Sequence, residues 1–151
     1  MSNMEYFFVQ DNQLTGTIST NIGNFKLLKE LRVSENQLDG TIPEELSESL
    51  FLGVAWFHLN NLNGTMPSGI CNLKDNYQLI GLQADCDSSN PLESPAVECD
   101  CCTSCCKQGM GLLECFLRAG NANLATLPPG TYDKYKYCLD ADRNPKEDED
   151  E

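Results

Sequence analysis

The chain has 151 residues, of which 40% are hydrophobic and 22% charged, and its formal net charge is −13. A hydrophobic fraction of this size excludes a wholly disordered chain, and 23 acidic against 10 basic residues argue against nucleic-acid binding, which needs clustered Lys and Arg. No stretch reaches the roughly 18 apolar residues of a membrane-spanning helix, and the opening residues lack the basic and apolar regions of a signal peptide.

A 24-residue period runs through the first half of the chain. Asn12, Asn36 and Asn60 are 24 residues apart, and a glycine follows each of them four residues later. Apolar residues recur in fixed columns around these marks, and in the first unit they are Met4, Phe7, Val9, Leu14, Ile18 and Ile22. The period predicts repeat units near 4–27, 28–51 and 52–76.

The strict period ends after the third unit, and a one-residue slip opens a fourth unit near 77–85. With this slip, Tyr77, Ile80 and Leu82 occupy apolar columns and Asp85 takes the place of the asparagine. We therefore assign residues 1–85 to the repeats.

Each column has a structural meaning. Apolar and variable residues alternate early in each unit, as in a short strand with one buried face. The asparagine column is typical of an inward side-chain amide that bonds backbone groups left unpaired by a bend. The glycine column is typical of a tight turn, and Pro43 and Pro67 follow this column in the second and third units. Each unit is thus one coil, and the coils bury their apolar residues by stacking.

The segments 38–43, Leu-Asp-Gly-Thr-Ile-Pro, and 62–67, Leu-Asn-Gly-Thr-Met-Pro, resemble the plant-type leucine-rich repeat, and the resemblance extends over roughly residues 4–85. It implies an α/β-type solenoid: a right-handed coil with short parallel strands on its concave face and irregular or 3-10 returns. Ser19, Ser49 and Ala55 depart from the pattern, and we expect mild packing defects there.

Cysteines dominate the next segment, since eight of the nine lie between Cys71 and Cys115. This density predicts a disulfide-rich cap over the last coil, formed with its appendage by residues 86–139. Adjacent cysteines rarely bond each other, so Cys71 and Cys86 are candidate partners across the cap, but the sequence leaves the pairing open. A zinc site that uses the Cys102-x-x-Cys105 spacing is the alternative, followed by a redox-active pair. All nine cysteines are candidates for disulfide bonds: Cys71, Cys86, Cys99, Cys101, Cys102, Cys105, Cys106, Cys115 and Cys138.

The run Ala84-Asp85-Cys86, followed by Cys-x-Cys-Cys-Thr-x-Cys-Cys, is also similar to the cap that closes many leucine-rich-repeat proteins of diatoms and related algae. Beyond it, the apolar residues of 112–117 suit one face of a short helix between Gly111 and Gly120. We expect Cys115 and Cys138 to staple this helix to the tyrosine-rich segment 132–137, and we expect residues 140–151 to be an acidic disordered tail.

Outward-pointing strand residues predict the ligand-binding surface. The fifth column of the four units reads Phe8, Arg32, Trp56 and Gly81, between a third column of Tyr6, Glu30, Val54 and Leu79 and a seventh of Gln10, Ser34, His58 and Gln83. Because neighbouring strands lie about 4.8 Å apart, Arg32 would lie between two aromatic rings in an exposed ladder. We expect a ligand to contact Tyr6, Phe8, Arg32, Trp56 and His58; the alternative is that these aromatics are ordinary surface residues. Asn63-Gly64-Thr65 is a predicted N-glycosylation site at Asn63.

No catalytic constellation is evident, because the chain has one histidine and no phosphate-binding motif. The first hypothesis is therefore a non-enzymatic binding module for a protein, peptide or glycan. We expect such a module to need neither a cofactor nor a metal. It would be the C-terminal part of a secreted or cell-surface receptor-like protein, attached to a membrane only through sequence outside this chain, since the apolar residues of the first coil have no cap. The alternative is an intracellular scaffold with reduced or zinc-binding cysteines, and a third possibility is a gene fragment without function.

Overall fold

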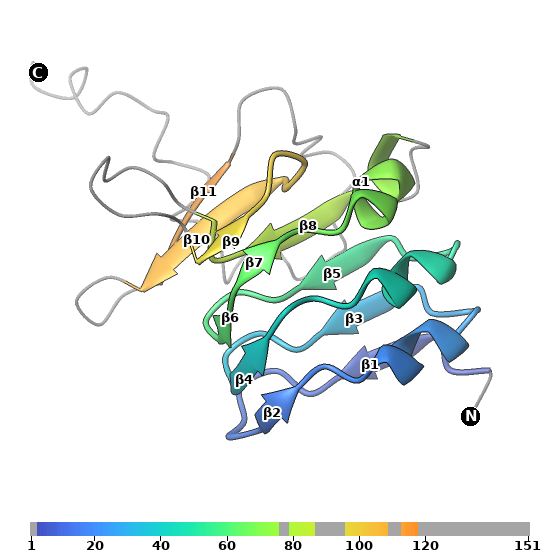
Figure 1. Ribbon diagram of the computed structural model, residues 1–151, viewed down its shortest axis with the longest axis horizontal. Helices are drawn as coiled ribbons and strands as arrows, with labels where there is room; N and C mark the ends of the chain where they lie inside the picture. The colour runs from blue at the N-terminus through green and yellow to red at the C-terminus, as the bar shows by residue number, and fades with distance from the viewer. Residues whose placement is uncertain (1–2, 76–78, 87–95, 109–112, 118–151) are drawn as a thin grey trace, which may run out of the picture.

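The computed structural model describes residues 3–75, 79–86, 96–108 and 113–117, and in the last two strands the side chains are described only as far as Cys106 (Figure 1). The elements in chain order are β1 (Tyr6–Phe8), β2 (Thr15–Thr17), the 3-10 helix η1 (Thr20–Asn24), β3 (Glu30–Arg32), β4 (Gln37–Gly40), the 3-10 helix η2 (Glu44–Glu48), β5 (Val54–Trp56), β6 (Asn61–Leu62), β7 (Gly64–Thr65), α1 (Ser68–Asp75), β8 (Gly81–Ala84), β9 (Val97–Glu98), β10 (Ser104–Gln108) and β11 (Leu113–Leu117).

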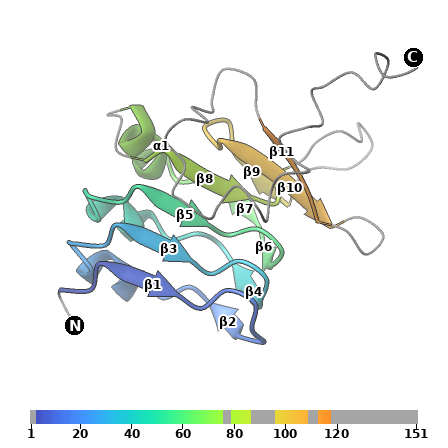
Figure 2. The ribbon, with the colours of Figure 1, turned by 180° about the vertical axis from the view of Figure 1, so that it is seen from behind.

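The elements form stacked coils, as the sequence predicts. A six-stranded sheet has the order β1-β3-β5-β8-β10-β11; its strands are parallel as far as β10, and β11 pairs with β10 in the antiparallel sense. A second, parallel sheet has the order β2-β4-β6. In Figures 1 and 2 η1, η2 and α1 stack on the side of the coils away from the six-stranded sheet. This is the leucine-rich-repeat fold, with short parallel strands and 3-10 returns.

The glycine column forms the predicted tight turn. Gly16, Gly40 and Gly64 have φ angles of 83°, 74° and 84°, a region that residues with a Cβ rarely adopt. A Cβ at Gly64 would also lie 3.1 Å from Thr41 in the preceding coil. The glycines therefore turn the chain and let neighbouring coils approach closely.

The asparagine column joins adjacent coils by side-chain hydrogen bonds. Asn36 Oδ1 accepts from the amide of Leu14 at 3.0 Å, and Asn36 Nδ2 donates to the carbonyl of Val9 at 2.9 Å, so that one side chain binds two backbone groups of the first coil. Asn60 repeats the arrangement one coil later, with Leu38 and Val33 as its partners. The predicted role of this column in bonding the backbone at the bend is confirmed.

Serines that depart from the repeat pattern make hydrogen bonds where we expected packing defects. Ser49 is buried, and its hydroxyl donates to the carbonyl of Phe25 in the preceding coil at 3.0 Å. Ser19 caps η1 by accepting from the amide of Asn21. Ala55 is also fully buried. Each of the two serine hydroxyls therefore has a backbone partner, and the expected packing defects stay a prediction.

The fourth coil has a different register from the one that the sequence predicted. Leu82 lies opposite Ala55, and Gln83, not Gly81, lies opposite Trp56. Leu79 is therefore buried in the core, whereas Ile80 packs on the opposite face of the sheet. The third coil is longer than a one-residue slip allows because its return is the eight-residue helix α1, where the first two coils have five-residue 3-10 helices.

Asp85 consequently has a different role from the asparagines. Its carboxylate accepts from the amides of Leu59 at 2.8 Å and Asn60 at 3.2 Å. The equivalent amides of the second coil, those of Glu35 and Asn36, donate instead to backbone carbonyls of the third coil. Burial raises the pKa of the Asp85 carboxyl, and the two amide hydrogen bonds oppose that rise. Asp85 thus ends the inter-coil ladder by replacing backbone acceptors with a carboxylate.

Residues after Cys86 close the last coil. The hydroxyl of Thr103 accepts from the amide of Leu82 and donates to its carbonyl, both at 2.9 Å, at the start of β10. Val97 and Cys102 join the hydrophobic core of the repeats. Residues 113–117 form a strand and not the expected helix, because they pair with β10 along its whole length. Among the described residues, no helix is long and apolar enough to cross a membrane.

Candidate functional site

The outward side chains of β1, β3 and β5 form one surface, here called the outer strand face: Tyr6, Phe8, Glu30, Arg32, Val54 and Trp56. The strands are in register, so that Tyr6, Glu30 and Val54 form one row and Phe8, Arg32 and Trp56 the next. Alternation along each strand directs these side chains away from the core, which takes Phe7, Leu31 and Ala55. The rows are those predicted from the sequence for the first three coils.

Arg32 lies between two aromatic rings, as predicted. Its guanidinium carbon is 4.7 Å from the ring centroid of Phe8 and 4.3 Å from that of Trp56. Arg32 Nε also donates to a carboxylate oxygen of Glu30 at 2.6 Å, and a terminal nitrogen forms an ion pair with the same oxygen. A cation held on two faces and one edge has little freedom, so this guanidinium is a fixed part of the surface.

The exposed end of the ladder is aromatic. Tyr6 and Phe8 are 55% and 48% exposed, and their rings meet edge to face with centroids 5.9 Å apart. Beside Tyr6, Lys29 donates to the carboxylate of Glu5 at 2.7 Å, and this hydrogen bond raises the pKa of Lys29. Large exposed rings in a preset geometry are well suited to contact a partner, because little side-chain entropy is lost on binding.

The expected exposure of Trp56 and His58 is wrong. Trp56 is 4% exposed and His58 is 0% exposed. Trp56 packs with Val54, Ile80 and Cys106 in a small cluster on the outer side of the sheet. Cys106 belongs to β10, which extends the sheet beyond the four predicted repeat units, so no repeat column shows this contact with Trp56.

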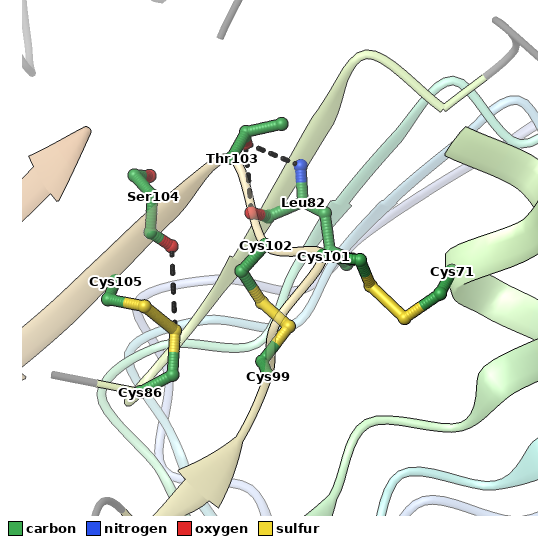
Figure 3. The surroundings of a disulfide bond; sticks show 9 residues. All are labelled: Cys71, Leu82, Cys86, Cys99, Cys101, Cys102, Thr103, Ser104 and Cys105. Atoms are coloured by element: carbon green, nitrogen blue, oxygen red, sulfur yellow. Dashed lines mark hydrogen bonds between the residues drawn. A yellow bond between two sulfur atoms is a disulfide. The ribbon is translucent and has the colours of Figure 1, made fainter. Parts of the chain in front are cut away.

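Three disulfide bonds join described cysteines, as Figure 3 shows: Cys71–Cys101, Cys86–Cys105 and Cys99–Cys102. Cys71 comes from α1, so the Cys71–Cys101 bond joins the cap to the repeats, whereas Cys86, which begins the cap after β8, is bonded within it. Cys106 is disulfide-bonded as well. The side chain of Cys115 and all of Cys138 lie outside the described residues, and so does the bond that we predicted between them.

Two further predictions concern the repeats. Asn63, the predicted glycosylation site, is exposed in the turn between β6 and β7. The apolar side chains of the first coil line an open pocket of about 370 Å³, which includes Met4, Phe7, Leu14, Ile18 and Ile22.

Comparisons with known proteins agree with this geometry. A family model described as Leucine Rich Repeat matches residues 27–49. The crystal structure of PEPR1–AtPEP1 is similar at 32% identity and a TM-score of 0.50, over 54% of this chain and 11% of that chain. A comparison with curated proteins finds no match.

Two more solved structures are similar in sequence. The leucine-rich-repeat ectodomain of the plant membrane receptor kinase GASSHO1/SCHENGEN3 from Arabidopsis thaliana, in complex with CASPARIAN STRIP INTEGRITY FACTOR 2, is 31% identical, with a TM-score of 0.45 over 52% of this chain and 9% of that one. The BIR3–SERK2 complex from Arabidopsis thaliana is 34% identical, with a TM-score of 0.40 over 46% and 37%. This chain therefore spans only a small part of the proteins that it matches. Its strand register and turns show the leucine-rich-repeat fold, and the family-model match over residues 27–49 and the partial similarity to the PEPR1–AtPEP1 structure agree with that fold.

Proposed function

We propose that the repeats form a recognition module without chemistry of its own, which binds a polypeptide ligand on the outer strand face. The contact residues would be Tyr6, Phe8 and Arg32, with Trp56 on the neighbouring strand supporting the guanidinium. The exposed, edge-to-face pair of Tyr6 and Phe8 is the observation that carries the proposal. Aromatic and arginine side chains are the commonest hot spots of protein interfaces.

The first three coils present this surface on regular strands and not on loops. Backbone bonds hold each strand to the next, and Asn36 and Asn60 fix the turn that follows. A ligand that lies across β1 and β3 would meet a preset row of rings, so its binding energy would not be spent on ordering the protein. His58 takes no part in this proposal, because it is buried.

The proposed setting is extracellular, where disulfide bonds persist. Three features favour it: the disulfides of the cap, one of which joins it to the repeats, the exposed sequon at Asn63, and the resemblance to receptor ectodomains. In a longer receptor-like protein, this segment would supply part of the ligand surface. The similarity of its cysteine pattern to the cap of diatom and algal proteins fits the same proposal.

A phage-displayed library of random linear peptides, selected on the oxidised chain, tests this function. We expect the selected peptides to lose about tenfold or more of their affinity for Phe8→Ala, as for a typical hot spot. Phe51→Ala is the matched control, since Phe51 is also a half-exposed phenylalanine, at 57%, but lies outside the outer strand face. Equal losses in both variants, or none in Phe8→Ala, would refute the proposed site. Enrichment on a glycan array with no peptide selected would refute the proposed class of ligand.

A further inference from the structure

Four cysteine sulfurs converge at the junction between the last coil and the cap. The sulfur atoms of Cys86, Cys99 and Cys102 all lie within 4.8 Å of one another. The sulfur of Cys105 is bonded to that of Cys86 and so lies beside the same group. All four residues are buried and come from two segments, as Figure 3 shows: Cys86 follows β8, whereas Cys99, Cys102 and Cys105 run from the end of β9 into β10.

Backbone contacts hold these two segments together independently of sulfur chemistry. Thr103 forms three hydrogen bonds with the backbone of Leu82, two through its hydroxyl and one from its amide. Directly after it, β10 pairs with β8, and the amide of Val97 donates to the carbonyl of Asp85. Because none of these bonds involves a cysteine side chain, they remain available when the disulfides are reduced.

The spacing of the four residues is that of a metal knuckle. Cys99-x-x-Cys102-x-x-Cys105 supplies three sulfurs from one short segment, and Cys86, two residues after β8, supplies the fourth. Zn²⁺ prefers four sulfur or nitrogen ligands in tetrahedral geometry, and structural zinc sites with four cysteines are closed to solvent, as this cluster is. The Cys102-x-x-Cys105 pair singled out from the sequence is thus half of a larger ligand set.

We propose that the reduced chain binds one Zn²⁺ through the thiolates of Cys86, Cys99, Cys102 and Cys105, and that this ion closes the cap in place of two disulfides. A dithiol reductant gives two electrons and two protons to each protein disulfide. The protein disulfide becomes two thiols, and the reductant becomes a disulfide. The four thiols then release four protons as their sulfurs bind the ion. The same junction can therefore be closed in an oxidising or in a reducing compartment. This inference does not rest on the proposed function.

Cobalt titration of the full chain tests the site. The chain is reduced with dithiothreitol, freed of it by anaerobic gel filtration and titrated with Co²⁺, which reports tetrahedral thiolate ligands by its visible absorption. We expect one equivalent of Co²⁺ per chain, with the bands of a four-thiolate site, and displacement of the cobalt by Zn²⁺. Circular dichroism recorded in parallel follows the fold; if reduction unfolds the chain, we expect metal to restore its spectrum.

Two double variants locate the ligands. Cys99→Ser/Cys102→Ser removes half of the proposed set, and we expect the four-thiolate spectrum to be lost. Cys71→Ser/Cys101→Ser is the matched control; it removes the third disulfide of the cap but no proposed ligand, and we expect both the stoichiometry and the spectrum to be retained. The proposal is overturned if the reduced wild type, folded or unfolded, gives no tetrahedral thiolate bands, or if the first variant gives the same bands as the control.

Discussion

Replacement of Asn36 by alanine measures how strongly the asparagine column joins the coils. The variant loses two bonds between coils, from the amide of Leu14 at 3.0 Å and to the carbonyl of Val9 at 2.9 Å, together with local bonds to Val33 and Ser34. Each net hydrogen bond contributes about 1 kcal/mol, and a buried group left without a partner costs about 1–3 kcal/mol. We therefore expect Asn36→Ala to lower the free energy of unfolding by about 2–4 kcal/mol, as measured by urea unfolding followed by circular dichroism.

Asn12 provides the matched control within the same column. Its side chain is exposed and bonds only the carbonyls of Val9 and Gln10 in its own coil. Water can replace those bonds, so Asn12→Ala should cost less than about 1 kcal/mol. The reasoning would be refuted if the two variants lost the same free energy, because the bonds between coils would then contribute nothing.

Three further predictions concern the sheet and the cap. Trp56→Ala should lower the free energy of unfolding by about 3–5 kcal/mol, whereas Phe8→Ala, at a half-exposed ring, should change it by less than about 1 kcal/mol; equal urea midpoints would contradict the burial of Trp56. Asp85→Ala leaves two amides of the third coil without acceptors and should cost about 1–3 kcal/mol, and an unchanged melting temperature would show that water satisfies them. Peptide mapping of the unreduced chain by mass spectrometry should find the bonds Cys71–Cys101, Cys86–Cys105 and Cys99–Cys102, and any other partner for Cys71 would contradict the structure of the cap.

The repeat could be predicted because local rules determine it. Gly40 needs a positive φ, Asn36 needs backbone partners, and Leu31 must point inward, and each requirement recurs 24 residues later. The same columns place Arg32 between Phe8 and Trp56, since parallel strands in register bring equivalent positions together.

The errors occurred where the period ends. Ile80 and Leu82 have the same spacing as the inward pair Phe7 and Val9, so the sequence permits a register that the longer return through α1 excludes. Residues 113–117 have helical apolar spacing, yet pairing with β10 makes them a strand, because a tertiary partner outweighs local propensity.

The burial of Trp56 depends in the same way on distant parts of the chain. It packs against Cys106 and Ile80, which belong to the segments after the third coil. Column position predicts that a side chain points outward, but not whether later elements cover it. The accessible part of the candidate site therefore narrows to the first two coils, at the exposed Tyr6 and Phe8 and the partly buried Arg32.

The most direct test of the binding face is photocrosslinking at two matched positions. Benzoylphenylalanine is introduced in place of Phe8 or of Phe51, and each chain is irradiated with a peptide selected on the wild type. We predict a crosslink from position 8 that excess unlabelled peptide suppresses, and none from position 51. A crosslink from position 51 alone, or from neither position while the peptide stays bound, would contradict recognition on the outer strand face.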